Sequence, residues 1–400
     1  MLRPSSETMR NQLNFALCSV VLAIGCGDNG GTKVDAGTPD TPPDACVPTS
    51  TRGTVTRGDL AMDATQRAVF QDMAPPLDRS VLIYSVRENE SSPRFGAVTC
   101  ELVPADAIAQ TPAGLSCKHE SMGTDSNPAV PVTIHWQVVT FDQGVKVHRG
   151  VADTSTVNPQ SLTLPASVDP AKSFIVLGGA FAGGGGWGNN DFTIAELKNA
   201  TTLEIRHNAM GAVVPWQIVE MQGAKVQRGT TSLATADTTK AVALTGVAPG
   251  SFVLATHTND NPSSIIASAM MLQATLMSET SLVFKRAMSG TAMDVAYEIV
   301  TLPFPARQFT TDFAAAETTK MQAVPNLPAA TSVAFSTVQA VAGQSTGSTA
   351  YADAITLDLV GEAAATLTVS ANSVAVQRAT GTSTASITWN AIDFGSDACN

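Results

Sequence analysis

The chain has 400 residues, of which 44% are hydrophobic and only 14% charged, and its net charge is −11. This length allows two to four domains, and the many Thr, Ser, Ala, Val and Gly residues favour β structure in an exported protein. The acidic balance argues against nucleic acid as a partner, because a protein that binds the phosphate backbone needs a basic face.

The first 25 residues predict an export signal. Arg3 and Arg10 give a basic start, and an apolar run follows at 15–24. This run is too short to cross a bilayer, because a membrane helix needs roughly 20 residues. It ends in Leu22-Ala-Ile-Gly-Cys26, which resembles the lipobox of bacterial lipoproteins. The resemblance implies cleavage before Cys26 and its acylation, palmitate included, with anchoring at the bacterial outer membrane or cell surface. A plain secretory signal that is cleaved elsewhere is the alternative.

Residues 26–45 predict a flexible, disordered tether. This segment is rich in Gly, Pro and Asp and has almost no apolar residues, so it cannot bury a core. Its aspartates lack the regular alternation and the closing Glu of a calcium-binding loop. We therefore predict no metal site in it.

One phrase then repeats along the rest of the chain. An aromatic strand is followed by a turn and by Val-x-Arg-Gly, as in Trp136–Phe141 before Arg149-Gly150. The aromatic residues of the phrase are Trp136, Trp216, Tyr297 and Trp389, and its arginines are Arg57, Arg149, Arg228 and Arg307. Most of these landmarks are about 80 residues apart, and self-similarity at a fixed period predicts an array of one small module.

The repeat divides the chain into four units, at 46–143, 144–222, 223–304 and 305–400. In most of the short segments of the third unit, apolar or β-branched residues alternate with polar ones between turn residues. The segments of this unit are 226–231, 240–245, 251–257, 268–276, 280–286 and 293–302. Met270, Met271 and Leu272 break this alternation, which predicts burial of their segment on both faces. Six such strands in about 79 residues favour a small antiparallel β-sandwich. The predicted fold class is thus all-β, with four tandem six-stranded antiparallel β-sandwich repeats after a disordered tether.

The order of phrases within a unit resembles the H-type lectin domain, a six-stranded antiparallel β-sandwich. The resemblance rests on the Val226-Gln-Arg-Gly229 opening, the Ser251–Leu254 strand and the closing aromatic strand, and it extends over 47–396. It implies binding of N-acetylgalactosamine-type sugars at subunit boundaries, often through a Trp-His-Asn stretch before the closing strand. Arg206, His207 and Asn208 form the stretch that comes nearest to this pattern, with Arg in place of Trp.

Two further residues are candidates for ligand binding. Trp187 follows a run of four glycines, which predicts an exposed loop where a sugar ring could stack on the indole. His257 lies in Thr256–Asp260, which predicts a loop mouth. For both, the alternative is an ordinary loop residue without a ligand. We predict that the repeated Trp residues are core residues at the seam between units, and that the repeated arginines hydrogen-bond to the next unit.

Four cysteines remain after the signal and the lipidation site. Cys100 and Cys117 fall on successive predicted strands, so a disulfide between them is expected in an oxidising compartment. Two buried free thiols are the alternative. Cys46 and Cys399 map onto Val138 and Lys146 of the first turn between units, where we expect the two flanking strands to form a hairpin. This mapping predicts a Cys46–Cys399 bond that closes the four units on themselves or links one chain to the next.

No unit carries a nucleophile, a base and an orienting group at a suggestive spacing, and no histidines pair at zinc-ligand spacing. Gly343-Gln-Ser345-Thr-Gly347 has the letters of a nucleophile elbow, but it falls between two predicted strands and is interpreted as a loop. We therefore predict no enzyme, catalytic residue, metal or cofactor. The expected function is that of a membrane-anchored surface lipoprotein with a structural or adhesive role. The alternative is a carbohydrate-binding, H-type lectin-like protein. Expected partners are the membrane, through the lipid anchor, and surface glycans or other surface proteins.

Overall fold

The computed structural model describes most of the chain after residue 51. The described ranges are 52–63, 65–88, 98–108, 111–119, 131–178, 192–208, 213–260, 267–342, 365–378 and 384–395. The predicted tether, the predicted lipidation site Cys26 and the segment from Gly343 to Gly347 lie outside these residues. The described part is built from β-strands, with one short 3-10 turn at Leu77–Arg79 and the four-residue helix α2 at Ala267–Met270.

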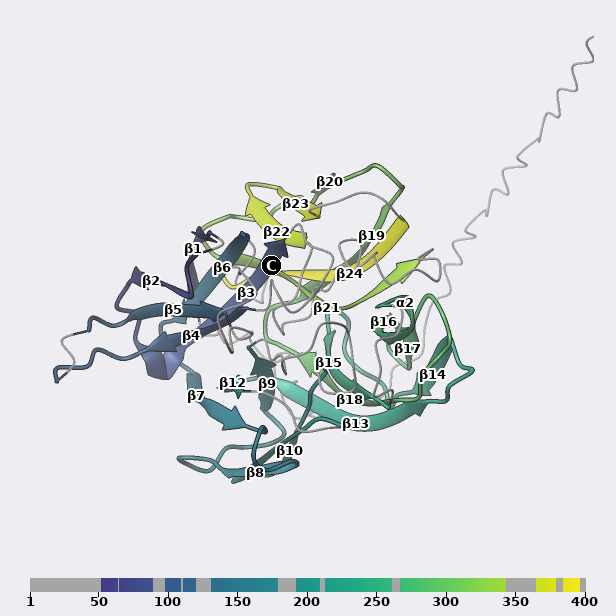
Figure 1. Cartoon of the computed structure of the whole chain (residues 1–400), viewed down its shortest axis with the longest axis horizontal. Helices are drawn as coiled ribbons and strands as arrows, with labels where there is room; N and C mark the ends of the chain where they lie inside the picture. The colour runs from purple at the N-terminus through teal and green to yellow at the C-terminus, as the bar shows by residue number, and fades with distance from the viewer. Residues whose placement is uncertain are drawn as a thin grey trace, which may run out of the picture. The chain divides into compact units, whose positions relative to one another are not determined.

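The strands fall into four consecutive groups of six, which we call units 1 to 4 (Figure 1). Unit 1 contains β1 (Gly53–Met62), β2 (Ala68–Asp72), β3 (Ser80–Glu88), β4 (Val98–Val103), β5 (Gly114–His119) and β6 (Val132–Phe141). Unit 2 contains β7 (Val145–Asp153), β8 (Gln160–Thr163), β9 (Ser173–Leu177), β10 (Ile194–Asn199), β11 (Thr202–Arg206) and β12 (Val213–Met221).

The other two units repeat this order. Unit 3 contains β13 (Lys225–Leu233), β14 (Thr239–Ala243), β15 (Phe252–Asn259), β16 (Gln273–Ser278), β17 (Ser281–Lys285) and β18 (Met293–Thr301). Unit 4 contains β19 (Ala306–Phe313), β20 (Thr319–Ala323), β21 (Ser332–Ala342), β22 (Ala365–Ser370), β23 (Ser373–Arg378) and β24 (Thr384–Asp393).

Every unit has two three-stranded antiparallel sheets, and their strand order is the same throughout. The inner sheet joins the first, sixth and third strands, as in β1-β6-β3 and β7-β12-β9. The outer sheet joins the second, fifth and fourth strands, as in β2-β5-β4 and β14-β17-β16. The predicted fold class is therefore confirmed: the chain is all-β, with four six-stranded antiparallel sandwich repeats.

One strand of unit 3 begins later than the predicted start at residue 268. The segment from residue 268 first forms α2, and the strand β16 starts only at Gln273. Met270, Met271 and Leu272 are all almost fully buried. The burial expected for this apolar run is therefore present, although its residues precede β16 rather than belong to it.

Each sandwich has its own core, and the repeated Trp lies inside it. Trp216 packs with Leu203, Ile205 and Ile218 in the core of unit 2. Its strand places Gly150 directly opposite, where a Cβ atom would lie 2.6 Å from the indole ring. The Gly of the Arg-Gly phrase is thus needed because the ring lies directly on the backbone. The prediction that these Trp residues are core residues is confirmed, but they do not form the seam between units.

A fifth core lies between the four inner sheets. Alternate residues of the third and sixth strands of every unit point into it, among them Phe141, Phe174 and Phe252, and Phe394 joins them directly after the sixth strand of unit 4. It encloses a cavity of about 40 Å³ whose lining is entirely apolar. The inner sheets are therefore buried on both faces, which explains the nearly continuous apolar runs in the sixth strands.

The four units form a closed ring. Unit 4 contacts unit 1 through the same kinds of bonds that join units adjacent in the sequence. The Gly53 N–H donates to the Phe394 carbonyl at 3.1 Å, which matches the Ala224–Met221 bond of 3.1 Å in the turn between units 2 and 3. The Val55 N–H donates to the carbonyl of Ala330 in unit 4 at 2.8 Å. These contacts are non-covalent substitutes for a connecting turn.

The sequence predicted hairpins at the turns between units, but these turns are not hairpins. β6 pairs with β1 and β3, whereas β7 pairs with β12, so Val138 and Lys146 belong to different sheets. Gly144 and Gly223 do adopt the positive φ values, 73° and 80°, that these turns require. The facing-position argument for a Cys46–Cys399 bond is therefore wrong.

Candidate functional site

The junctions between units are held by one buried polar side chain that follows the repeated aromatic residue. At the junction of units 1 and 2, Gln217 accepts from the Leu82 N–H at 3.0 Å and donates to the Leu82 carbonyl at 2.9 Å. At the junction of units 4 and 1, Gln137 makes the same two bonds with Ala334. A single amide thus satisfies the open edge of the neighbouring inner sheet.

The junction of units 2 and 3 has a carboxylate at this position. Glu298 accepts from the Ile175 N–H at 2.7 Å through one oxygen, and its other oxygen lies 2.8 Å from Nε of Arg228. Burial raises the pKa of the Glu298 carboxyl, against the opposing effects of Arg228 and of the Ile175 N–H. This junction is therefore the one where a buried ion pair replaces a neutral amide.

The repeated arginines donate to backbone carbonyls of the preceding unit. Arg228 bonds the carbonyls of Pro170 and Ser173 in unit 2, and Arg149 bonds those of Leu77 and Ser80 in unit 1. Arg57 reaches unit 4 in the same way. Hydrogen bonding between units was predicted, although the acceptors lie in the preceding unit rather than in the next one.

Arg307 does not belong to this set. Its guanidinium donates to the carbonyls of Pro325 and Asn326 in its own unit. Gln308 faces Asn390 across the sheet, as Arg228 faces Glu298 in unit 3. Gln308 therefore holds the position of the repeated arginines in unit 4. Neither the oxygen nor the nitrogen of the buried Asn390 amide has a partner among the described residues.

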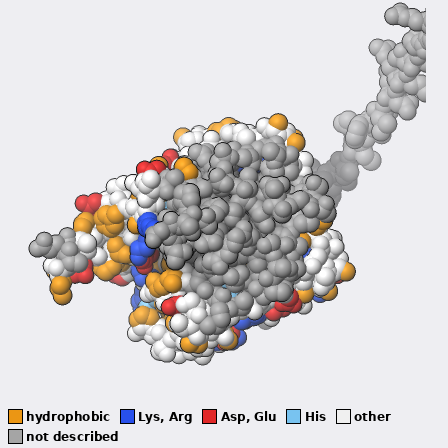
Figure 2. All heavy atoms as spheres, viewed as in Figure 1, with side chains coloured by type: hydrophobic (Ala, Val, Ile, Leu, Met, Phe, Trp, Pro, Cys, Tyr) orange, Lys and Arg blue, Asp and Glu red, His pale blue; other side chains and the backbone are white. Residues whose placement is uncertain are grey.

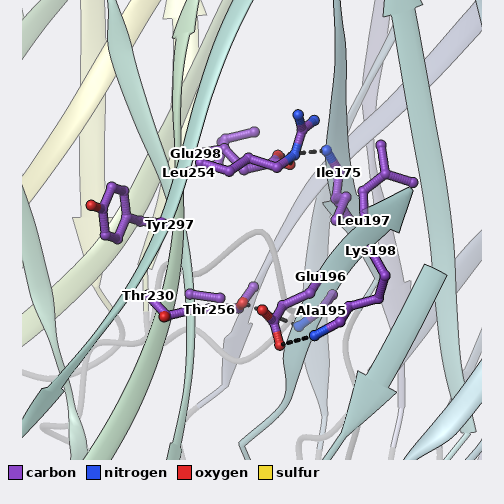
Figure 3. A pocket seen from close by; sticks show the side chains of 13 residues that line it. Ile175, Ala195, Glu196, Leu197, Lys198, Thr230, Leu254, Thr256, Tyr297 and Glu298 are labelled. Atoms are coloured by element: carbon purple, nitrogen blue, oxygen red, sulfur yellow. Dashed lines mark hydrogen bonds and ion pairs between the residues drawn. The ribbon is translucent and has the colours of Figure 1, made fainter. Parts of the chain in front are cut away.

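A cavity of about 280 Å³ opens beside the Arg228–Glu298 pair, between β10 of unit 2 and the inner sheet of unit 3. Figure 3 shows Glu196 and Lys198, whose charged groups lie 3.4 Å apart, together with Thr230 and Thr256. Small apolar groups complete the wall; they are Ile175, Ala195, Leu197, Leu254 and Ala296. The cavity therefore combines two ion pairs, two hydroxyls and an apolar wall.

A smaller cavity of about 160 Å³ lies at the equivalent place between units 1 and 2. It is lined by β4, by Arg149-Gly150 and by the strand that carries Gln217. The two cavities are therefore versions of one site, and the one between units 2 and 3 is the larger and the more polar in its side chains.

Two residues of the predicted ligand-binding stretch hold units 2 and 3 together. Arg206 lies 3.3 Å from Asp294 of unit 3, and Asn208 donates to the Asn259 carbonyl at 2.8 Å and to Asp260 at 2.6 Å. His207 lies between them and is buried within unit 2, where its N–H donates to the side chain of Asn158 at 3.0 Å. The stretch thus lies at the expected boundary, with its side chains bonded to other residues of the chain.

The other two candidates have different outcomes. His257 is not at a loop mouth: it lies within β15, is buried, and contacts the Met270 carbonyl through Nε2 at 2.9 Å. Burial lowers its pKa to about 4, so its ring is neutral near pH 7. Its ring centroid lies 4.7 Å from that of Phe192 in unit 2. Trp187 lies outside the described residues.

Sequence reasoning missed most of the residues that line the larger cavity. Glu196, Lys198, Thr230 and Thr256 were not among the candidate residues. Glu298 carried a usable signal, because an acidic residue in the most apolar strand of the repeat requires a buried partner.

Cys100 and Cys117 face each other on β4 and β5 and form a disulfide, so this expected bond is present. Cys46 and Cys399 lie outside the described residues. They are seven and five residues from Gly53 and Phe394, which the closure joins by a hydrogen bond. A Cys46–Cys399 bond within one chain therefore stays a prediction, now with a different reason. Non-reducing mass spectrometry of the purified monomer should show no free thiol at either cysteine, and two free thiols there would contradict it.

No protein-family model matches the sequence, and no curated protein matches it. The part of the chain that the structure describes contains no group of three or more His, Cys, Asp or Glu side chains placed to hold a metal ion. Within the same residues, no helix is long and apolar enough to cross a membrane.

Proposed function

We propose that this protein is a lipid-anchored surface protein with a structural or adhesive role and without enzymatic activity. The lipobox-like Cys26 supplies the anchor, and residues 26–45 supply the tether. The closed set of four sandwiches supplies a stable body on which partners dock. Surface glycans or other surface proteins are the partners that we expect.

The use of buried polar groups carries this proposal. The buried polar side chains bond one unit to the next; they are Gln137, Gln217, Glu298 and the three repeated arginines that bond the preceding unit. The polar residues that looked most like ligand groups, Arg206 and Asn208, also join units. Buried polar groups that bond the units to one another make the scaffold rigid, and a rigid scaffold suits a structural or adhesive role.

Exposed apolar side chains support an adhesive contact. Figure 2 shows hydrophobic side chains among the charged ones over unit 1, on the left of the view. On this unit Phe70 is 43% exposed and Ile108 is 97% exposed. Apolar and aromatic side chains of this kind anchor protein–protein contacts.

The proposal is tested on cells that carry the full-length protein. Replacement of Cys26 by Ala should move the protein from the membrane fraction to the soluble fraction and abolish incorporation of labelled palmitate. Replacement of Phe70 by Ser should leave the membrane fraction unchanged and weaken cell adhesion, with Thr54→Ala as a surface control. Membrane association that survives loss of Cys26, or adhesion that is unchanged without the protein, would contradict the proposal.

A carbohydrate-binding role is the second candidate, and the cavity between units 2 and 3 favours it. Its hydroxyls, its Glu196–Lys198 pair and its apolar wall resemble the mixture that recognises a sugar ring. The H-type lectin resemblance points to the same kind of boundary. A glycan array and a melting screen at millimolar sugar test this candidate, with Glu196→Gln as the variant. No sugar-dependent response would rule it out, while leaving the anchored adhesive role open.

A further inference from the structure

One backbone position recurs in the fourth strand of every unit and faces the next unit. It is the residue that pairs with the first apolar residue of the fifth strand. Its four members are Leu102, Leu197, Leu276 and Val369, which pair with Leu115, Leu203, Leu282 and Val374. The fourth strand is an edge strand of its outer sheet, so every second residue turns its N–H and C=O out of the sheet. The contacts of Leu276 and Val369 with the next unit place this position in the outward set.

In two junctions the next unit supplies a side chain to this position. Gln308 of unit 4 accepts from the Leu276 N–H at 3.1 Å and donates to the Leu276 carbonyl at 3.2 Å. Arg57 of unit 1 donates to the Val369 carbonyl at 3.0 Å. The protein thus fills the position from its own chain where a side chain can reach it.

In the part of the chain that the structure describes, no such side chain reaches this position at the junction of units 2 and 3, nor at that of units 1 and 2, where Arg149 bonds Leu77 and Ser80 instead. Arg228 holds the place of Gln308, but it is bonded to Glu298, Pro170 and Ser173. The Ala195 N–H donates to Thr256 of unit 3 at 3.2 Å, so Leu197, two residues further on, turns its N–H and C=O the same way. Among the described residues no hydrogen bond outside the sheet reaches Leu197, and Leu197 lines the 280 Å³ cavity.

The N–H and C=O of Leu197 face this cavity without a partner among the described residues, so a ligand that bonds both gains affinity. In the Gln308 contact, one primary carboxamide presents its oxygen and its syn N–H side by side. An ordinary trans peptide amide directs these two groups to opposite sides and cannot reproduce the contact. The volume of 280 Å³ equals that of about nine waters in the liquid, which is room for a ligand of roughly ten non-hydrogen atoms.

We propose that the cavity between units 2 and 3 is a binding site for a primary carboxamide, held by the N–H and C=O of Leu197. The ligand repeats the contact that Gln308 makes with Leu276. Its apolar portion lies against Ile175, Leu254 and Ala296, and its amide nitrogen donates to the Leu197 carbonyl. This site goes beyond the proposed surface role and does not depend on the lipid anchor.

Ligand-observed fluorine NMR on the mature chain tests the proposal. The probe is 4-fluorobenzamide, and methyl 4-fluorobenzoate is the comparison, because the ester keeps the carbonyl oxygen and lacks the N–H donor. The amide should bind saturably, and the ester at least about fivefold more weakly, as the loss of one net hydrogen bond predicts. Equal binding of the two probes, or no binding of the amide, would overturn the proposal.

A double variant gives the junction of units 2 and 3 the side chains of the junction that Gln308 fills. Arg228→Gln with Glu298→Asn recreates the Gln308–Asn390 pair opposite Leu197, so the new carboxamide should occupy the position and abolish probe binding. If that variant does not fold, Leu197→Pro removes the N–H on an edge strand, where Pro is tolerated. Binding of the amide that is unchanged in a folded version of either variant would overturn the assignment.

Discussion

Replacing Glu298 by Ala will lower the free energy of unfolding by about 3–5 kcal/mol. The reason is that Arg228, whose side chain is 22% exposed, loses the carboxylate 2.8 Å from its Nε. The Ile175 N–H loses its acceptor as well. Chemical denaturation of the variant and of the parent chain measures the difference.

Replacing Glu298 by Gln is the matched control. Gln occupies the equivalent position in the junctions made by Gln137 and Gln217, where it bonds both backbone groups of the facing strand. Glu298→Gln should therefore stay within about 1 kcal/mol of the parent at pH 7. A loss as large as that of the Ala variant would show that the charge, rather than the hydrogen bonding, holds this junction.

The free energy of unfolding should also depend differently on pH in the parent and in the Glu298→Gln variant. Burial raises the pKa of Glu298 above its ordinary value of 4.5. A carboxyl with a raised folded-state pKa stabilises the fold in its protonated form; this contribution is fully present below about 4.5 and is lost as the pH rises through the raised value. The parent should therefore lose stability relative to Glu298→Gln as the pH rises above about 4.5. A stability difference that does not change with pH would contradict the raised pKa.

Deleting unit 4 will abolish the stable monomer. A chain that ends at residue 304 lacks Val333, Phe335, Ile392 and Phe394 of the central core. Each apolar side chain that loses its cover costs about 1.5–3 kcal/mol, and the remaining three units all face the open core. The deletion also removes the acceptors of Arg57 and Gln137. We expect aggregation or cooperative unfolding, measured by size-exclusion chromatography and urea denaturation.

An open array predicts a different result, because in a linear repeat protein each unit contacts only its neighbours and a terminal unit is dispensable. A circular permutant separates the two cases. Its old ends near residues 52 and 395 are joined by a short Gly-Ser linker, and its new ends lie in the turn at 142–144. This permutant keeps every junction and should fold. If the chain of units 1–3 unfolds at the same urea concentration as the parent, closure of the ring is not needed for stability.

The unit itself was predictable because its signals are local. Period-two alternation and turn residues identified six strands, and the repeated phrase identified four copies. The core position of Trp216 followed from its place in an apolar strand. The disulfide of Cys100 and Cys117 was expected from their places on successive strands, because paired strands bring opposite residues together.

The register of unit 4 shows where the sequence pattern failed. Arg307 matched the repeated arginines by spacing, yet Gln308 holds their structural position, because Phe309 rather than residue 308 stacks on Trp389 with ring centroids 4.6 Å apart. A shift of one residue moves every side chain of a strand to the other face, so packing against the core decides the register. Spacing along the chain does not contain that information.

The sequence by itself determined the β-sandwich unit and its fourfold repetition, since strand alternation and turn chemistry act over a few residues. Only the tertiary structure decided that unit 4 closes on unit 1, that Glu298 finds Arg228, and that Leu197 faces a cavity while Leu276 faces Gln308. These outcomes depend on which sheet edges meet between residues that lie from 32 positions apart, as in Leu276 and Gln308, to 341 positions apart, as in Gly53 and Phe394. Their physical cause is the burial of both faces of the inner sheets, because a buried polar group such as Gln217 or Glu298 is stabilised by a partner in a neighbouring unit.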